Sequence, residues 1–300
     1  SPAEMQTALR ALESALAAAP KFSAAQSALA DVWAHITELE YRPTAEAAPK
    51  TREVARAAQA LEPNSAEAHL ALGVAAAFSS WDWTAARKEL EQALVLRPSY
   101  TYANSRLAAI DQTLGNTKAA VERLEQARAL DPSQQSVNVA LGFAYVFDGQ
   151  NDKALELMNS LEKLDPEYKV IRLVRALAYF NKKEYARVGS QLDVMSKLRA
   201  WMPPSLSITA PAAVHLGRPE EARTALTELR DKENFPNVDP VVLAGILLAL
   251  GEDKEAFSLL NKAVESRSTL LLTRPVNPVF ADYRKDPRFR EILGKLNASR

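Results

Sequence analysis

The sequence predicts an all-α fold, a right-handed superhelical solenoid of helix-turn-helix units that ends in a C-terminal capping helix. Two spacings in the sequence predict this fold. The first is the return of glycine in steps of 34 residues or a multiple of 34, at Gly115, Gly149, Gly217 and Gly251. The second is the same interval between prolines, at Pro98, Pro132 and Pro166. A fixed period in this range indicates an array of small units that each pack on their neighbours.

The composition agrees with a helical, globular chain and excludes several kinds of site. Hydrophobic residues make up 47% and charged residues 25%, and the 37 basic side chains balance the 37 acidic ones. The net charge is therefore zero, and it does not indicate binding to nucleic acid or to a basic partner. The chain has no cysteine, which excludes disulfides, thiolate catalysis and cysteine-ligated metals. Cytoplasm and periplasm both stay open, with the cytoplasm favoured, and no apolar run reaches the roughly 18 residues of a membrane span.

The period divides the chain into units, which we treat as one solenoid domain over residues 1–300. Five consecutive units hold phase without an insertion: 101–134, 135–168, 169–202, 203–236 and 237–270. Three less regular segments precede them: a partial unit at 1–20 with a lone helix over 3–18, a unit at 21–63 with helices over 22–39 and 44–61, and a unit at 64–100. The cap occupies residues 271–300.

Each unit reads as two helices because apolar residues recur at helical spacing on both sides of a turn. Small residues at positions 8 and 20 of the unit let the two helices approach closely. Glycine at position 15 accepts the positive φ of a tight turn, and proline at position 32 stops the second helix. Asn181-Lys182-Lys183 fills the one such slot without glycine in the five regular units, and Trp81-Asp82-Trp83 replaces glycine in unit 64–100.

The 34-residue repeat pattern ends after residue 264, and the segment 268–285 shows little periodicity. Asp286-Pro287 then offers a helix N-cap followed by proline at the first helical position. Apolar residues follow at helical spacing, at Phe289, Ile292, Leu293 and Leu296. We expect a helix that covers the open apolar face of the last repeat.

This pattern resembles the consensus of the tetratricopeptide repeat (TPR). Two stretches resemble the TPR regions of one group of bacterial regulators more closely: Trp81-Asp82-Trp83, and the tail from Pro278-Val279-Phe280 to Asp286-Pro287-Arg288-Phe289. The resemblance spans about residues 20–297. It implies the sensory or regulatory part of a signalling or transcription regulator, which would be preceded by a winged-helix, adenylate cyclase or protein kinase domain, often with a TolB-like segment. The chain departs from the group's pattern at Tyr283, where leucine is usual, and at Arg175, where an apolar residue is usual.

The first residues and the lack of known catalytic motifs lead us to expect a non-enzymatic piece of a larger protein. The chain begins Ser1-Pro2 without methionine, so we expect a processed chain or an excised part. His35, His69 and His215 lie in separate units without shared spacing, so they predict neither a metal site nor an acid–base cluster. No phosphate-binding loop or nucleophile elbow is present. We therefore expect no enzyme activity, no cofactor and no metal.

The inner face of such a solenoid is where it would hold a protein or peptide partner. The resemblance places positions 2, 5, 9, 12 and 13 of each first helix on this face. An apolar, aromatic groove is predicted there, with Arg106 at position 6 and Arg172 and Arg175 as anchors for acidic groups. The candidate residues are Phe78, Tyr102, Arg106, Phe143, Phe147, Arg172, Arg175 and Phe180. Only Arg106 matches the carboxylate clamp of chaperone-binding relatives, so we do not expect a chaperone tail.

Other interpretations stay open at this point. The aromatic residues could bury one another, or a missing domain could cover them. The module could self-associate or dock on its own signalling domain. Unit 169–202 carries a local excess of Lys and Arg, but nucleic-acid-binding repeats carry such a stripe unit after unit. An RNA- or DNA-binding repeat is therefore the remotest alternative.

Overall fold

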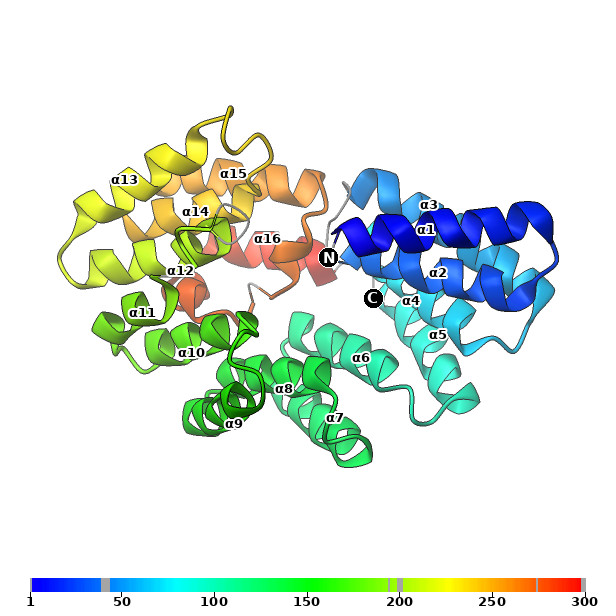
Figure 1. Cartoon of the computed structure of the whole chain (residues 1–300). Coiled ribbons are helices and arrows are strands. Elements are labelled where there is room, and N and C mark those ends of the chain that lie inside the picture. Colours follow the sequence, from blue (N-terminus) through cyan, green and yellow to red (C-terminus); the bar gives the residue numbers. More distant parts are fainter. Residues whose placement is uncertain (1, 39–43, 194, 199–201, 274, 298–300) are drawn as a thin grey trace. The chain divides into compact units, whose positions relative to one another are not determined.

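The computed structural model describes residues 2–38, 44–193, 195–198, 202–273 and 275–297, and these residues form helices, turns and no strand (Figure 1). The all-α prediction is confirmed. The α-helices are α1 (Pro2–Ala18), α2 (Ser23–Glu38), α3 (Thr44–Leu61), α4 (Ala66–Ser80), α5 (Trp83–Leu96), α6 (Thr101–Thr113), α7 (Thr117–Leu130), α8 (Gln135–Phe147), α9 (Asn151–Leu164), α10 (Val170–Asn181), α11 (Tyr185–Leu192), α12 (Met202–His215), α13 (Pro219–Arg230), α14 (Pro240–Ala249), α15 (Asp253–Glu265) and α16 (Pro287–Asn297). Two 3₁₀ helices, η1 (Thr269–Thr273) and η2 (Pro278–Tyr283), lie between α15 and α16.

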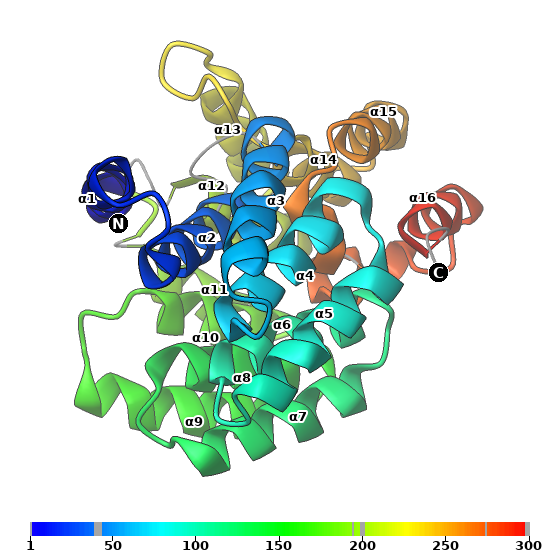
Figure 2. The ribbon, with the colours of Figure 1, turned by 90° about the vertical axis from the view of Figure 1, so that its right-hand side faces the viewer.

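Helix packing divides the chain into two compact units, and the boundary falls inside α6. The first unit runs to Ile110 and includes the end of α16 from Lys295, and the second unit runs from Asp111 to Gly294. In the first unit α2 packs on α3 and α4, and α4 packs on α5; Figure 2 shows α3 alongside α2 and α4. The single-domain organisation stays a prediction.

The second unit is built of helical hairpins in two layers. The first helices of its repeats, α8, α10, α12 and α14, pack side by side in the order of the chain. The second helices α9, α11, α13 and α15 each pack on the first helix of their own hairpin, and α7 packs on α8. We call the layer of first helices the A-helix layer. No helix of the described chain is long and apolar enough to cross a membrane.

The turns between paired helices have the backbone that the sequence predicts. Gly149 has a φ of 82°, and Gln150 donates its backbone N–H to Tyr145 O at 2.7 Å. Such a bond, from the residue five positions further along the chain, ends a helix in a left-handed residue, which glycine adopts without steric cost. Lys183 at the slot without glycine has a φ of 61°, and Trp81 has a φ of 53°. The Lys183 turn has the geometry of the Gly149 turn, since Glu184 donates to Tyr179 O at 2.9 Å. The Trp81 turn differs, because Trp81 and Asp82 both donate to Ala76 O.

The paired helices approach closely at the small residues of position 8. A Cβ built on Gly142 would lie 2.6 Å from Met158 Cε, and one on Gly73 would lie 2.7 Å from Leu90 Cγ. The second helices α5, α7 and α9 end at Leu96, Leu130 and Leu164, each two residues before a proline. Both features agree with the repeat pattern in the sequence.

The C-terminal helix begins where the sequence predicts. The Asp286 carboxylate accepts the backbone N–H of Arg288 at 2.8 Å, and Pro287 is the first residue of α16. Phe289 is fully buried and its ring stacks on Phe280 at a centroid distance of 5.8 Å. The predicted N-cap and apolar face of this helix are thus confirmed.

Candidate functional site

The A-helix layer of the second unit carries a pair of aromatic rings on α8. Phe143 and Phe147 are one helical turn apart, and their ring centroids lie 6.1 Å apart at an interplanar angle of 30°. Both side chains are half-buried, whereas the opposite face of α8 contributes Val137, Leu141 and Ala144 to the core. This pair is the part of the predicted groove that keeps exposed aromatic surface in the second unit.

The ring of Phe180 on α10 is covered by side chains from the next helices. Tyr185 at the start of α11 lies edge-on to it at 5.2 Å, and His215 at the end of α12 lies edge-on at 5.7 Å. The rings of Tyr185 and His215 stack on each other at 4.4 Å. Phe180 is only 5% exposed, so its ring stabilises the contact between repeats and offers little surface to a partner.

The two arginines that were predicted as acid anchors in this unit share one internal carboxylate. Arg175 is buried on α10, and its guanidinium donates to Glu162 Oε2 on α9 at 2.5 Å and approaches Met158 O at 3.5 Å. Arg172 lies 3.9 Å from the other oxygen of Glu162. The hydrogen bond from Arg175 lowers the pKa of Glu162. Position 7 of this repeat therefore holds an arginine because the preceding helix supplies a carboxylate.

The first unit stacks a tyrosine between a histidine and an arginine. The rings of Tyr102 on α6 and His35 on α2 lie parallel at 4.4 Å, and the Arg106 guanidinium lies 5.0 Å from the centre of the Tyr102 ring. All three side chains are half-buried. Phe78 on α4 is 8% exposed, so it belongs to the core of this unit.

A polar network lies beside this stack. The Tyr100 hydroxyl donates to Asp31 at 3.2 Å, and Arg97 donates to Glu67 and lies over the Tyr100 ring at 4.5 Å. Burial raises the pKa of Asp31, although nearby His35 and the Tyr100 hydrogen bond favour its ionised form. Burial also acts to raise the pKa of Glu67, but the hydrogen bond from Arg97 outweighs it and leaves this pKa below its usual value.

The two tryptophans of the Trp81-Asp82-Trp83 turn are both buried. Trp81 ends α4 in the left-handed region, and Asp82 accepts the backbone N–H of Ala85 as the N-cap of α5. The Trp83 indole N–H donates to Leu296 O at 2.5 Å, and both residues belong to the first unit. These rings pack and cap the turn, and their indole faces are not open to a ligand.

The basic side chains of unit 169–202 are largely paired with carboxylates. Lys182 binds Asp152 at 2.6 Å and lies 3.5 Å from Glu184, which also binds Arg187 at 2.9 Å. The Arg187 guanidinium lies 4.0 Å from the centre of the Tyr179 ring. Part of the local excess of positive charge in the sequence is therefore offset by acidic residues of this repeat and the preceding one.

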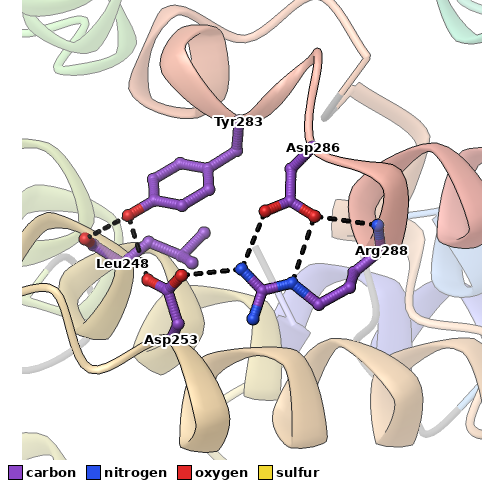
Figure 3. Close-up of polar contacts among 5 residues, drawn as sticks. All are labelled: Leu248, Asp253, Tyr283, Asp286 and Arg288. Carbon is purple, nitrogen blue, oxygen red and sulfur yellow. Dashed lines mark hydrogen bonds and ion pairs between the residues drawn. The ribbon is translucent and has the colours of Figure 1, made fainter.

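Sequence reasoning missed a further occupant of the A-helix layer, the segment 275–286, which we call the strap. Its 3₁₀ helix η2 packs on α10, and Phe280 lies against Gly245 of α14, where an added Cβ would be 3.3 Å from the ring. Figure 3 shows Tyr283 reaching α14 and α15: its hydroxyl donates to Leu248 O at 2.8 Å and lies 3.2 Å from Asp253 Oδ1. The sequence signal for the strap was the pair Phe280 and Tyr283, two aromatic residues in a segment without helical periodicity.

An exposed clamp of charges joins the C-terminal end of the strap to α15 and α16 (Figure 3). Arg288 donates to Asp253 and Asp286, each at 2.7 Å, and its guanidinium lies 4.0 Å from the centre of the Phe257 ring. The hydrogen bond from Arg288 lowers the pKa of Asp286 to about 2. Burial and the Asp253 charge raise the pKa of Tyr283 to about 12. Tyr283 thus stays a neutral donor over the physiological pH range.

The three histidines serve different neighbours and do not converge. His35 lies against Tyr102, His69 binds Glu89 at 2.7 Å, and His215 lies against Tyr185. Over the described ranges, no group of three or more His, Asp or Glu side chains is placed to hold a metal ion.

Comparisons with known proteins agree with this architecture. A family model described as tetratricopeptide repeat matches residues 113–178, and no curated protein matches the chain. A solved tetratricopeptide repeat protein from Parabacteroides merdae is 16% identical, with a TM-score of 0.57 over 88% of this chain and 98% of its own. Human IFIT1, in a dimer with m7Gppp-AAAA, is 16% identical, with a TM-score of 0.59 over 99% of this chain and 77% of its own. Yeast Tom70 is 17% identical, with a TM-score of 0.56 over 98% of this chain and 62% of its own.

At these identities the solved structures establish the fold and nothing finer, whereas the family match establishes the repeat itself. The matched residues run from the end of α6 to α10 and include the hairpin of Phe143 and Phe147. Such repeats bind protein partners. Residues 113–178 match the tetratricopeptide repeat, and the chain has the fold of solved TPR proteins, as the 34-residue spacing predicts.

Proposed function

We propose that the chain is a protein-interaction module that holds a segment of a partner protein on its A-helix layer, with Phe143 and Phe147 as the main contacts in the second unit. The supporting observation is the exposure of this pair beside buried Phe180. Aromatic side chains that keep exposed surface on a rigid helical layer are typical anchors of peptide binding. The absence of a carboxylate clamp in the sequence favours apolar contacts over capture of a chain terminus.

The resemblance of the tail and of the Trp81-Asp82-Trp83 turn supports a finer proposal. We infer that the module is the sensory or regulatory part of a bacterial signalling or transcription regulator. The partner segment would then report a stimulus to a signalling domain of the longer protein. An RNA-binding role has weaker support, because carboxylates offset the basic side chains of unit 169–202.

The test is a pull-down with the double variant Phe143→Ala, Phe147→Ala, compared with the wild-type chain and a matched control. Val95→Ala is the control, because Val95 is 72% exposed on α5, which lies outside the A-helix layer. We expect the double variant to lose the partners that the wild type and the control retain. Unchanged partners in the double variant would refute the groove.

A second candidate function is self-association, and exposed leucines on the second helices favour it. Leu130 and Leu164 stand 34 residues apart at the same position of their repeats and are 62% and 82% exposed. Exposed apolar groups at equivalent positions can pair between copies. Light scattering at increasing concentration separates the two functions: a chain that stays monomeric excludes self-association, and a Leu130→Lys, Leu164→Lys variant that reverses assembly would locate it.

A further inference from the structure

We propose that the A-helix layer at α10 and α14 is itself a binding surface for a short aromatic segment, and that the strap occupies it within the same chain. A partner segment with the chemistry of Pro278-Val279-Phe280 and Tyr283 would bind there only after the strap leaves. This inference rests on the proposed use of the A-helix layer for binding, and it assigns to that layer a second site with a built-in competitor.

The first observation is the composition of α14. Its residues from Val241 to Leu248 are all apolar or glycine and all are buried. A helix that is apolar on every side needs cover on every side. Helices α12, α13 and α15 pack on α14, and the strap covers the part at Gly245. Without the strap, this part of α14 would present an apolar surface of the kind that marks a binding site.

The second observation is the fit of one aromatic ring. Phe280 is 1% exposed and lies against Gly245, and Val279 lies 3.7 Å from the Cβ that this glycine lacks. An alanine at this position would crowd the ring. A glycine inside a helix costs stability relative to alanine, and here it makes room for a phenyl ring that comes from a different segment.

The third observation is the way the strap is fastened. Polar contacts hold its C-terminal end: Tyr283 donates to Leu248 O, and the exposed Arg288 joins Asp286 to Asp253. Exposed ion pairs contribute little to stability and weaken in salt. The strap contains the short 3₁₀ helix η2, and 3₁₀ helices have poorer hydrogen-bond geometry than α-helices. The inner ring is therefore tightly packed while the outer fastening is weak.

The contacts of the strap define the segment that fits. Phe280 fills the space beside Gly245, and the Tyr283 hydroxyl donates to Leu248 O and to Asp253. The occupant is thus an apolar–aromatic segment whose Phe and Tyr stand three residues apart.

The experiment supplies the occupant in trans. The probe is a fluorescent peptide with the sequence of residues 275–286, and fluorescence anisotropy measures its binding to the full chain. The wild-type surface is occupied, so its apparent affinity is lowered by the fraction of chains with the strap released. The Phe280→Ala variant should bind the peptide at least about tenfold more tightly than the wild type. A peptide with alanine in place of Phe280 should not bind it, and the variant Val95→Ala should behave as the wild type.

A second measurement covers the case in which Phe280→Ala does not fold. Tyr283→Phe keeps the packing of the ring and removes its hydrogen bonds to Leu248 O and Asp253. In this variant the backbone amides of η2 should exchange with deuterium severalfold faster, while those of α14 keep their protection. Exchange in η2 as slow as in α14 in both proteins, or a Phe280→Ala variant that folds and does not bind the peptide, would overturn the inference. Neither result alters the pull-down at Phe143 and Phe147, which tests the proposed function separately.

Discussion

Replacement of Lys183 by glycine should stabilise the protein, because this lysine occupies a turn position that glycine fills in the other regular repeats. Lys183 has a φ of 61°, close to the 82° of Gly149 one repeat earlier. The hydrogen bonds also match: Lys183 N–H donates to Phe180 O at 2.9 Å, and Gly149 N–H donates to Val146 O at 3.1 Å. The two turns differ in their side chain and hardly at all in their backbone.

The magnitude follows from two opposing effects. A non-glycine residue in the left-handed region costs about 1–2 kcal/mol. Glycine gains back that strain but loses about 0.5–1 kcal/mol through the greater freedom of the unfolded chain. The Lys183→Gly variant should therefore raise the free energy of unfolding by about 0.5–1 kcal/mol. Gly149→Lys should lower it by a similar amount, because a Cβ there meets no atom within 4 Å and the backbone strain acts alone.

Thermal unfolding measures both changes as shifts of about 1–4 °C. Lys182→Gly is the matched control, since the neighbouring Lys182 has an ordinary φ of −76° and binds Asp152. This control should destabilise, although it is also a Lys-to-Gly change in the same turn. A Lys183→Gly variant that melts below the wild type would refute the reasoning, because the left-handed backbone would then carry no cost.

The remaining predictions concern buried charge and close helix packing. Burial raises the pKa of Asp31. The protonated Asp31 carboxyl therefore stabilises the fold fully below the usual pKa of 3.8, and this contribution is lost as the pH rises through the folded pKa. Asp31→Asn should raise the melting temperature at pH 7 and leave it unchanged at pH 3. Gly73→Ala should lower the free energy of unfolding in urea by about 1–2 kcal/mol, because overpacking against Leu90 exceeds the gain in helix propensity. Glu162→Ala should cost about 3 kcal/mol in urea denaturation by leaving Arg175 buried and unpaired, whereas Arg175→Leu should change stability by less than about 1 kcal/mol; equal effects of the two changes would contradict this account.

The repeat units could be predicted from the sequence because their determinants are local. The turn at Gly149 needs one residue of positive φ, and the close contact at Gly142 needs one residue without a side chain. Each requirement recurs at a fixed spacing, so a single chain displays it several times. The helices over 22–39 and 44–61 were predicted from the same logic, and the structure places α2 and α3 within one residue of these bounds; residues 39–43 between them lie outside the described part of the chain.

The candidate site could be predicted only in part, because contacts between repeats are not periodic. The exposure of Phe143 and Phe147 follows from their places on one helix. The cover over Phe180 comes from Tyr185 and His215, which stand on two other helices. No spacing within one repeat predicts that these rings meet. The same holds for Phe280, which reaches α14 from a segment without any repeat pattern.

The two departures from the pattern of the bacterial regulators that the sequence resembles have a common explanation. Arg175 stands where an apolar residue is usual, and it donates to Glu162 of the preceding helix. Tyr283 stands where leucine is usual, and its hydroxyl donates to Leu248 O of the last repeat. A buried polar group in an apolar position is costly unless a partner satisfies it, so each departure in the sequence predicts a polar partner nearby in space.

The polar contacts of Arg175 and Tyr283 have different consequences for the A-helix layer. The departure at Arg175 joins two neighbouring helices of the regular array, and it serves the stability of that array. The departure at Tyr283 joins the strap to α14, and it serves only the closure of a surface that the array already forms. A strap that opens reversibly needs a polar contact such as the Tyr283 hydrogen bond, since a leucine at residue 283 would hold the strap by burial alone. The side chain of Tyr283 therefore suits a strap that can open.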